Sequence, residues 1–183
     1  ADCINILSGV TIEDITYQCV DEFTESGYYC NDLYALQKIM QANPNSIYPG
    51  LDADSNSVIS VFEYGSQNWI NGRLETLNLS YNENVVMPTF CNFKLEFIPE
   101  NIGDLDFLRI LILKNNEITT LPESIGDLGI LEQLILESNR FTILPESIGN
   151  LHKLKILYAH NNLITSLPDS FTELENLEVL WLH

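Results

Sequence analysis

Basic side chains are scarce in this 183-residue chain. It has 8 Lys and Arg against 26 Asp and Glu, which gives a formal net charge of −18. A general nucleic-acid binder needs clustered Lys and Arg to neutralise phosphates, so the composition excludes that class. The same charge disfavours docking on anionic membrane surfaces. No segment approaches the roughly 20 consecutive apolar residues of a membrane span, so we expect no direct membrane insertion.

Catalytic and leader motifs are missing as well. The sequence holds no GxSxG, HExxH, P-loop or GxGxxG pattern. No histidine is placed with a cysteine or serine in a way that suggests a nucleophile and its base. We therefore predict that the protein is not an enzyme. No charged segment followed by an apolar one precedes Ala1, so we expect any signal peptide to have been removed already.

Cysteine is absent from the second half of the chain. The four cysteines are Cys3, Cys19, Cys30 and Cys91. An even number crowded toward one end favours a disulfide-stapled cap made in an oxidising compartment. Three pairings are open, of which we favour Cys3–Cys19 with Cys30–Cys91; the alternative is buried free thiols in a cytosolic protein. The sequon Asn78-Leu79-Ser80 makes Asn78 a candidate glycosylation site and agrees with secretion.

What the chain does have is an internal repeat with an interval of 23 residues. Prolines, leucines and asparagines recur at this interval, at Pro99, Pro122, Pro145 and Pro168, at Leu108, Leu131, Leu154 and Leu177, and at Asn116, Asn139 and Asn162. The unit reads LxxLxLxxNxITxLPxSIGxL. Alternate residues of LxxLxL point to one side of a short strand, and one unit cannot bury that apolar stripe alone. The units are therefore predicted to stack, with each asparagine satisfying turn backbone groups.

This unit resembles leucine-rich repeats, most closely the 23-residue type with an LPxSIGxL second half found in plant-type and Ras-group repeat proteins. The resemblance covers about residues 72–183. It implies an α/β fold, a right-handed solenoid with a curved parallel sheet of about five strands on its concave face. An insertion lies within 85–99, and the last repeat is truncated inside its strand. We expect that the natural protein continues, that a partner covers this open edge, or that the protein self-associates through it.

Residues 1–71 lack the repeat and are predicted to form a helical, disulfide-stapled amino-terminal cap. One helix is expected from residue 11 to about residue 26, and a second from 31 or 32 through 42. The segments 32–36 and 69–74 resemble the amino-terminal cap of plant-type extracellular repeat proteins. The cap is expected to cover the open core of the first repeat.

The segment 52–63 resembles the calcium loop of an EF-hand. Oxygen-bearing groups recur at the positions where such a loop holds Ca²⁺. The implied ligands are Asp52, Asp54, Asn56, the Val58 carbonyl, Ser60 and Glu63. Position 6 is Ser57 where a glycine is usual, and Pro49-Gly50 would interrupt an incoming helix. Ca²⁺ is the cofactor that this resemblance implies, and a solvated polar loop is the alternative.

Stacked strands place equivalent side chains in columns about 4.8 Å apart, which predicts an apolar band on the concave face. Contiguous exposed apolar area marks contact sites, and aromatic residues are preferred anchors. The predicted partner-binding residues are Ile112, Ile135, Tyr158, Trp181, Ile110, Ile156, Lys114 and His160. The alternative is that β-propensity fills these strand positions, with Trp181 buried under a next repeat. His160 and His183 beside Glu137 form a further candidate metal site or pH switch.

The sequence therefore predicts a secreted or cell-surface module that recognises or adheres to a protein or peptide through its concave face. Two alternatives stay open. One is an acidic, calcium-associated matrix or filament component that assembles through the solenoid ends. The other is a cytosolic scaffold similar to the Ras-group repeat proteins, which requires four reduced thiols.

Overall fold

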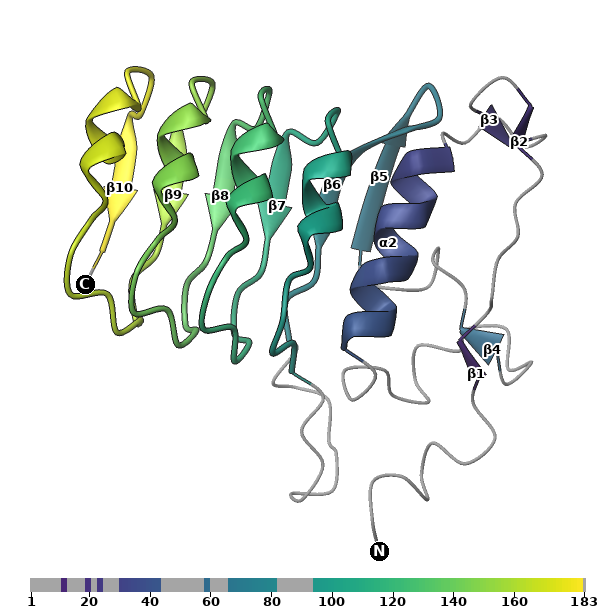
Figure 1. Cartoon of the computed structure of the whole chain (residues 1–183), viewed down its shortest axis with the longest axis horizontal. Helices are drawn as coiled ribbons and strands as arrows, with labels where there is room; N and C mark the ends of the chain where they lie inside the picture. The colour runs from purple at the N-terminus through teal and green to yellow at the C-terminus, as the bar shows by residue number, and fades with distance from the viewer. Residues whose placement is uncertain are drawn as a thin grey trace, which may run out of the picture.

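A computed structural model of the chain describes residues 30–43, 66–81 and 94–182, together with the backbone of four two-residue strands. Its main body is a six-stranded sheet in the order β10-β9-β8-β7-β6-β5 (Figure 1). β6 to β10 run parallel, and β5 pairs antiparallel with β6. Their bounds are β5 Ser66–Ile70, β6 Arg73–Asn78, β7 Ile110–Ile112, β8 Gln133–Ile135, β9 Ile156–Tyr158 and β10 Val179–Trp181.

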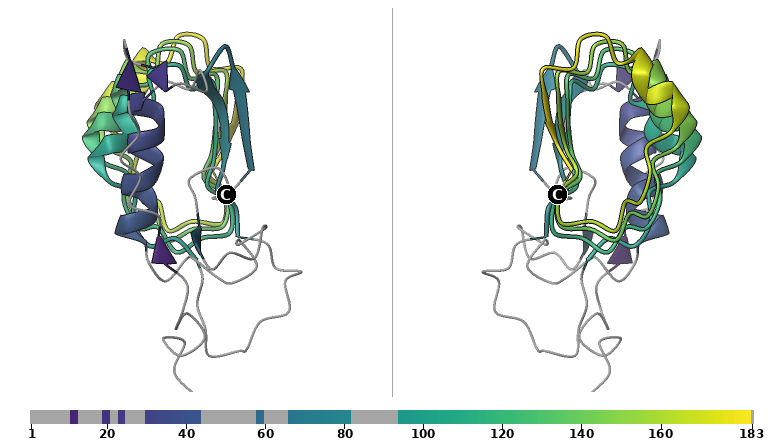
Figure 2. Two further views of the ribbon diagram at one scale, coloured as in Figure 1. Left: turned by 90° about the vertical axis from the view of Figure 1, so that its right-hand side faces the viewer. Right: turned by 90° about the vertical axis from the view of Figure 1, so that its left-hand side faces the viewer.

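A second layer of short 3-10 turns lies opposite the sheet. The turns are η4 Glu100–Asp104, η5 Glu123–Asp127, η6 Glu146–Asn150 and η7 Asp169–Glu173. Figure 2 shows the strands on one side and the turns on the other, with the interior enclosed between them. Leucines of the LxxLxL motif fill that interior, and Leu111, Leu134 and Leu157 are fully buried. The predicted fold, a stack of repeat units with about five parallel strands, is confirmed.

An asparagine ladder joins the units where the chain leaves each strand. The Asn139 amide nitrogen donates to the Leu136 carbonyl of its own unit at 3.0 Å and to the Leu113 carbonyl of the unit before at 2.8 Å. Its amide oxygen accepts from the Ile118 backbone N–H at 3.1 Å. Asn116 and Asn162 make the equivalent contacts. One side chain thus satisfies three backbone groups that burial would otherwise leave without partners.

Glycine in the SIG motif lets neighbouring 3-10 turns stack closely. A Cβ built on Gly126 would lie 2.6 Å from the Ser147 carbonyl oxygen and 2.8 Å from the Ser147 Cβ in the next unit. Gly103 meets Ser124 and Gly149 meets Ser170 at similarly short distances. The glycine of each unit therefore packs against the serine of the next unit.

The chain before the repeats adds one helix to the turn layer and one strand to the sheet. Helix α2, Cys30–Ala42, packs beside η4, and five of its apolar side chains are buried, namely Leu33, Ala35, Leu36, Ile39 and Met40. The prediction of a helix over 31–42 is confirmed, with its first residue at Cys30. β5 continues the sheet beyond β6.

A buried ion pair ties α2 to the first repeat strand. The Asp32 carboxylate is fully buried and accepts from Arg73 Nε at 3.1 Å and from the Leu74 backbone N–H at 2.8 Å. Burial raises the pKa of Asp32, although the bonds from Arg73 and Leu74 act in the opposite direction. Arg73 also binds Asp106, which lies two residues after η4. The 32–36 and 69–74 segments singled out in the sequence therefore meet at this pair.

The turn between β5 and β6 is Asn71-Gly72, and both residues have positive φ, 51° and 76°. This is the backbone of a two-residue hairpin, for which Asn-Gly is the preferred sequence. The hairpin was missing from the sequence expectations, although the dipeptide signals it.

The expected helix over 11–26 is wrong in its described parts. Thr11–Ile12, Cys19–Val20 and Phe23–Thr24 form strands β1, β2 and β3. β2 pairs antiparallel with β3, and β1 pairs parallel with β4, Val58–Ile59. β-branched and aromatic residues recur along this segment, and their preference for extended backbone outweighs the helical spacing of its apolar positions.

Several sequence predictions lie outside the described residues and stay predictions. They are the side chains of the four cysteines, residues 85–93 of the region 85–99 that holds the insertion, His183, and the calcium-loop ligands at 52, 54, 56, 60 and 63. Of the loop ligands only the Val58 backbone is described, in β4. Among the helices that are described, none is long and apolar enough to cross a bilayer.

The asparagine ladder predicts a position-specific loss of stability. We expect Asn139→Ala to lower the free energy of unfolding by about 1–3 kcal/mol, because it leaves the buried Ile118 N–H without an acceptor. The exposed Asn150→Ala is the matched control and should change it by less than about 0.5 kcal/mol. Urea denaturation followed by far-ultraviolet circular dichroism measures both. Equal effects of the two substitutions would contradict this account.

The close stacking of the turns predicts opposite behaviour for two neighbouring glycines. Gly126→Ala should destabilise the fold by roughly 1–3 kcal/mol, because backbone of the next unit must move. Gly129→Ala should be tolerated, since its added Cβ meets only the Asp127 carbonyl oxygen at 4.0 Å. Both changes alter the unfolded chain equally, so the difference in thermal midpoint isolates the contact. A midpoint that falls equally in both variants would remove the assigned role of Gly126.

Candidate functional site

The outward side chains of β6 to β10, together with the polar side chains that border them on both sides, form one continuous surface, which we call the strand face. The pairing register places Asn78, Ile112, Ile135, Tyr158 and Trp181 side by side in one column. The adjacent column is Thr76, Ile110, Gln133, Ile156 and Val179. Most of these side chains are half-buried by their neighbours within the sheet. Two columns that are largely apolar therefore run across five strands on the side of the sheet away from the core.

An aromatic cluster stands at the β9–β10 end of the strand face. The Tyr158 and Trp181 rings have centroids 5.2 Å apart and an interplanar angle of 32°. The His160 ring meets Trp181 nearly edge-on at 5.4 Å and Tyr158 at 6.2 Å. Trp181 is 56 % exposed, the most exposed large apolar side chain on this face. Rings held by such contacts present a preformed apolar surface with polar edges.

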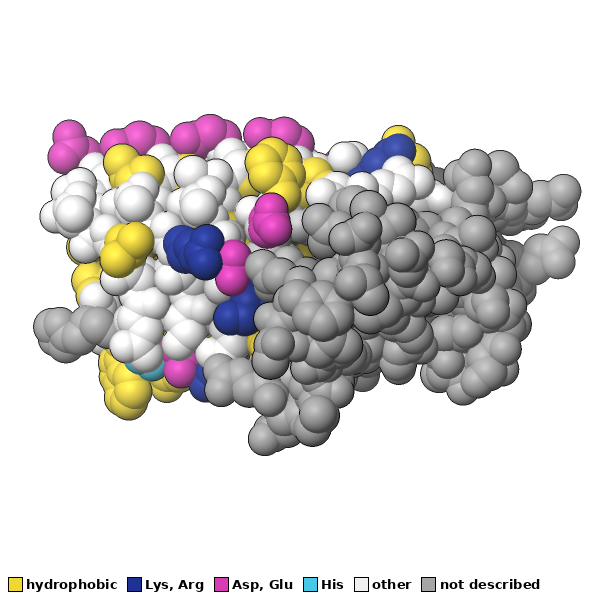
Figure 3. Space-filling view, turned by 90° about the horizontal axis from the view of Figure 1, so that it is seen from below, with side chains coloured by type: hydrophobic (Ala, Val, Ile, Leu, Met, Phe, Trp, Pro, Cys, Tyr) yellow, Lys and Arg dark blue, Asp and Glu magenta, His cyan; other side chains and the backbone are white. Residues whose placement is uncertain are grey.

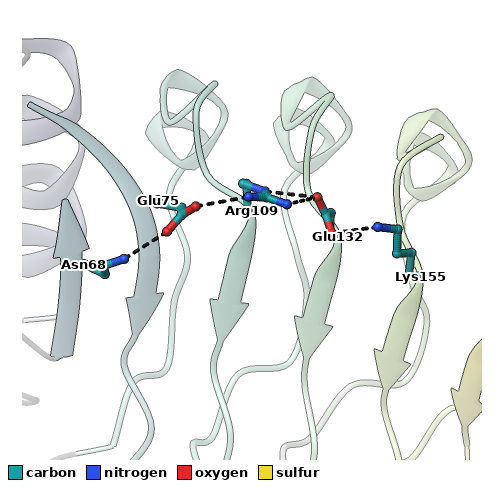
Figure 4. A network of polar contacts seen from close by, with 5 residues as sticks. All are labelled: Asn68, Glu75, Arg109, Glu132 and Lys155. Carbon is teal, nitrogen blue, oxygen red and sulfur yellow. Dashed lines mark hydrogen bonds and ion pairs between the residues drawn. The ribbon is translucent and has the colours of Figure 1, made fainter. Parts of the chain in front are cut away.

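A charged row borders the apolar columns on one side (Figure 4). Arg109 donates to Glu75 at 3.2 Å and from Nε to Glu132 at 3.0 Å. Lys155 binds Glu132 at 2.9 Å, and Asn68 donates to Glu75 at 2.9 Å. Hydrogen bonds from Lys155 and Arg109 lower the pKa of Glu132, and those to Glu132 and Glu75 raise the pKa of Arg109. These groups are largely exposed, so the row fixes charge positions more than it stabilises the fold.

A shorter charged group borders the columns on the other side. Lys114 Nζ lies 2.9 Å from Glu137 Oε1, and His160 Nε2 lies 3.4 Å from the same oxygen. The His160 Nδ1 atom is buried and has no hydrogen-bond partner. Within the described part of the chain, no group of three or more His, Cys, Asp or Glu is placed to hold a metal ion. The histidine metal site considered from the sequence therefore has only His160 and Glu137 in the described structure.

The structure brings all eight predicted partner-binding residues onto the strand face. Sequence reasoning missed the row of Glu75, Arg109, Glu132 and Lys155. Its signal was available, since Arg109, Glu132 and Lys155 recur at the repeat interval with alternating sign. Asn78, the candidate glycosylation site, lies in the same column as the apolar residues and accepts from the Ser80 N–H at 3.0 Å. A glycan there would cover the β6 end of the strand face.

The opposite layer has a different character. Figure 3 shows a row of acidic side chains along the edge that carries the 3-10 turns, and hydrophobic side chains beside a histidine at the opposite edge. Glu100, Glu123 and Glu146 open successive turns, and each carboxylate accepts from a serine backbone N–H in the next unit at 3.0–3.2 Å. These glutamates therefore connect successive units.

Comparison with known families decides the classification. The leucine-rich repeat region family matches residues 84–183, more than half of the chain. The chain belongs to the leucine-rich-repeat family. No curated protein sequence matches it. The repeating strands and 3-10 turns over this region agree with the match.

Solved leucine-rich-repeat structures resemble the chain. A plant ice-binding protein is 25 % identical with a TM-score of 0.62, over 85 % of this chain and 48 % of that one. The LRR protein LIC12759 of Leptospira interrogans is 29 % identical with a TM-score of 0.52, over 60 % and 25 %. The LRR ectodomain of the receptor kinase SOBIR1 from Arabidopsis thaliana is 24 % identical with a TM-score of 0.54, over 82 % and 77 %. The chain thus spans only a quarter of the Leptospira protein, and its fold resembles plant receptor ectodomains.

Proposed function

We propose that this protein is an extracellular recognition module that binds a protein or peptide on its strand face and performs no chemistry. One observation carries the proposal: two largely apolar columns lie on a sheet face turned away from the core, and one of them ends in the Tyr158–Trp181 pair. Water-facing positions of a sheet are usually polar, so an aliphatic and aromatic band there favours contact with a partner. Aromatic residues are also the commonest anchors of protein interfaces.

Solved structures of the same fold agree with this role. One was determined as the PEPR1–AtPEP1 complex, with a TM-score of 0.60, 24 % identity and coverage of 82 % of this chain and 21 % of that one. Another was determined as the BIR3–SERK2 complex from Arabidopsis thaliana. Folds host unrelated functions, so the residues of the strand face, and not the fold, carry the proposal.

Selection from a random peptide library tests binding on the strand face. We expect phage-displayed peptides to be enriched on the immobilised protein, and Tyr158→Glu to weaken the enriched peptides at least tenfold by placing a charge in the apolar band. Leu163→Glu is the matched control, because Leu163 is 61 % exposed in the loop after β9 and lies off the strand face. Affinity is measured by fluorescence anisotropy with synthetic peptides.

Two outcomes would overturn the binding proposal. One is a library that yields no enriched peptide. The other is a set of peptides whose affinity falls equally with Tyr158→Glu and Leu163→Glu, which would assign binding to a general property of the surface. Circular dichroism of both variants separates a lost contact from a lost fold.

The extracellular part of the proposal has its own test. We expect native-source protein to show no alkylated thiol before reduction and four after it, because disulfides persist in oxidising compartments. Intact mass spectrometry with iodoacetamide measures this, and glycosidase treatment reports any sugar at Asn78. Four alkylated thiols before reduction would instead favour the intracellular scaffold.

A further inference from the structure

Every cation on the strand face is already paired. Arg109 binds Glu75 and Glu132, Lys155 binds Glu132, and Lys114 binds Glu137. All four ion pairs join adjacent units, so each of these positive charges is already paired with a carboxylate inside the two charged rows. The strand face therefore offers no free cation, among the described residues, to an incoming anionic partner.

One carboxylate of the same row has no such partner. Glu178 follows Lys155 at the repeat interval, but Lys155 turns to Glu132 on its other side. Within the described structure no Lys or Arg lies at ion-pair distance from the exposed Glu178. Glu178 immediately precedes β10, about 10 Å along the strand from Trp181. In the described structure Glu178 adds a negative charge at the end of the strand face that carries the aromatic pair.

The aromatic pair itself favours cations. The faces of Trp and Tyr rings carry negative electrostatic potential, and Arg lies over them more often than Lys does. Trp181 is 56 % exposed, and Tyr158 holds its ring from one side. The net charge of −18 adds a long-range attraction for positive groups and a repulsion for negative ones.

We propose that the partner of the strand face is a polypeptide segment with a cationic side chain, Arg in particular, next to an apolar one. The cation stacks on the Tyr158–Trp181 pair, with the exposed Glu178 carboxylate on the same strand, and the apolar side chain rests on the band formed by Ile135 and Ile156. This inference rests on the proposed function, since it names the chemistry of the partner for the same surface. An acidic partner would meet no free cation among the described residues of this face.

The test uses the enriched library peptides as probes. Replacing their Arg by citrulline keeps the shape of the side chain and removes its charge. We expect this change to weaken binding to the unmodified protein roughly three- to thirtyfold, the range of a partly desolvated cation–π contact. The citrulline effect should largely disappear in Trp181→Leu, which keeps an apolar side chain without the ring, and should diminish in Glu178→Gln.

A charge-matched control separates local recognition from general attraction. Glu123→Gln removes the same charge from the 3-10 turn layer and should leave the citrulline effect unchanged. A citrulline effect that survives Trp181→Leu but falls in Glu123→Gln would overturn the inference in favour of non-specific attraction to the acidic layer. Circular dichroism of each variant shows that the fold is retained.

The two proposals can fail separately. Enriched peptides that lack Arg and Lys, yet lose affinity in Tyr158→Glu, would overturn this inference and leave the strand-face function standing. A library without any peptide sensitive to Tyr158→Glu would overturn the proposed function and this inference with it.

Discussion

The structure depends on how buried turns satisfy their backbone groups. In each unit the chain turns sharply where it leaves the strand. The asparagine at that corner donates hydrogen bonds to carbonyls of its own unit and of the unit before. Because the same side chain also accepts an N–H from the loop of the previous unit, it fixes the distance between successive turns. A constant interval between units then aligns every other position, including the leucines inside and the columns outside.

The surface chemistry follows from this alignment. Parallel strands in register place residues 23 positions apart side by side. The residue type at one position of each unit therefore sets the chemistry of a whole column across the sheet. On one border of the apolar columns the residues alternate in charge, and Glu132 forms ion pairs with both Arg109 and Lys155. In the middle it is aliphatic and aromatic. The stack thus separates the structural residues, which point inward, from a surface that can vary without cost to the core.

The repeat region was predictable because its signals are periodic and local. Leucines at the strand spacing, prolines before the turns and the asparagine at each corner all predict the same unit, and the columns follow from the interval alone. The cap was less predictable. Its helix has an apolar face and ends just before Asn43. The 11–26 segment combines helical spacing with β-branched residues, and its backbone pairing in the structure favours strands over a helix. The Asp32–Arg73 pair joins residues 41 apart, and only the folded chain places them together.

The central claim is that a partner binds the strand face. Isoleucine methyl groups test it directly, because Ile110, Ile112, Ile135 and Ile156 lie on that face while Ile102, Ile125 and Ile148 are fully or almost fully buried in the turn layer. Methyl-selective NMR of the protein, titrated with a library-selected peptide, should shift the first group and the Trp181 indole signal and leave the second group unchanged. Shifts confined to Ile130 or Ile143, which are exposed outside the strands, would contradict the account.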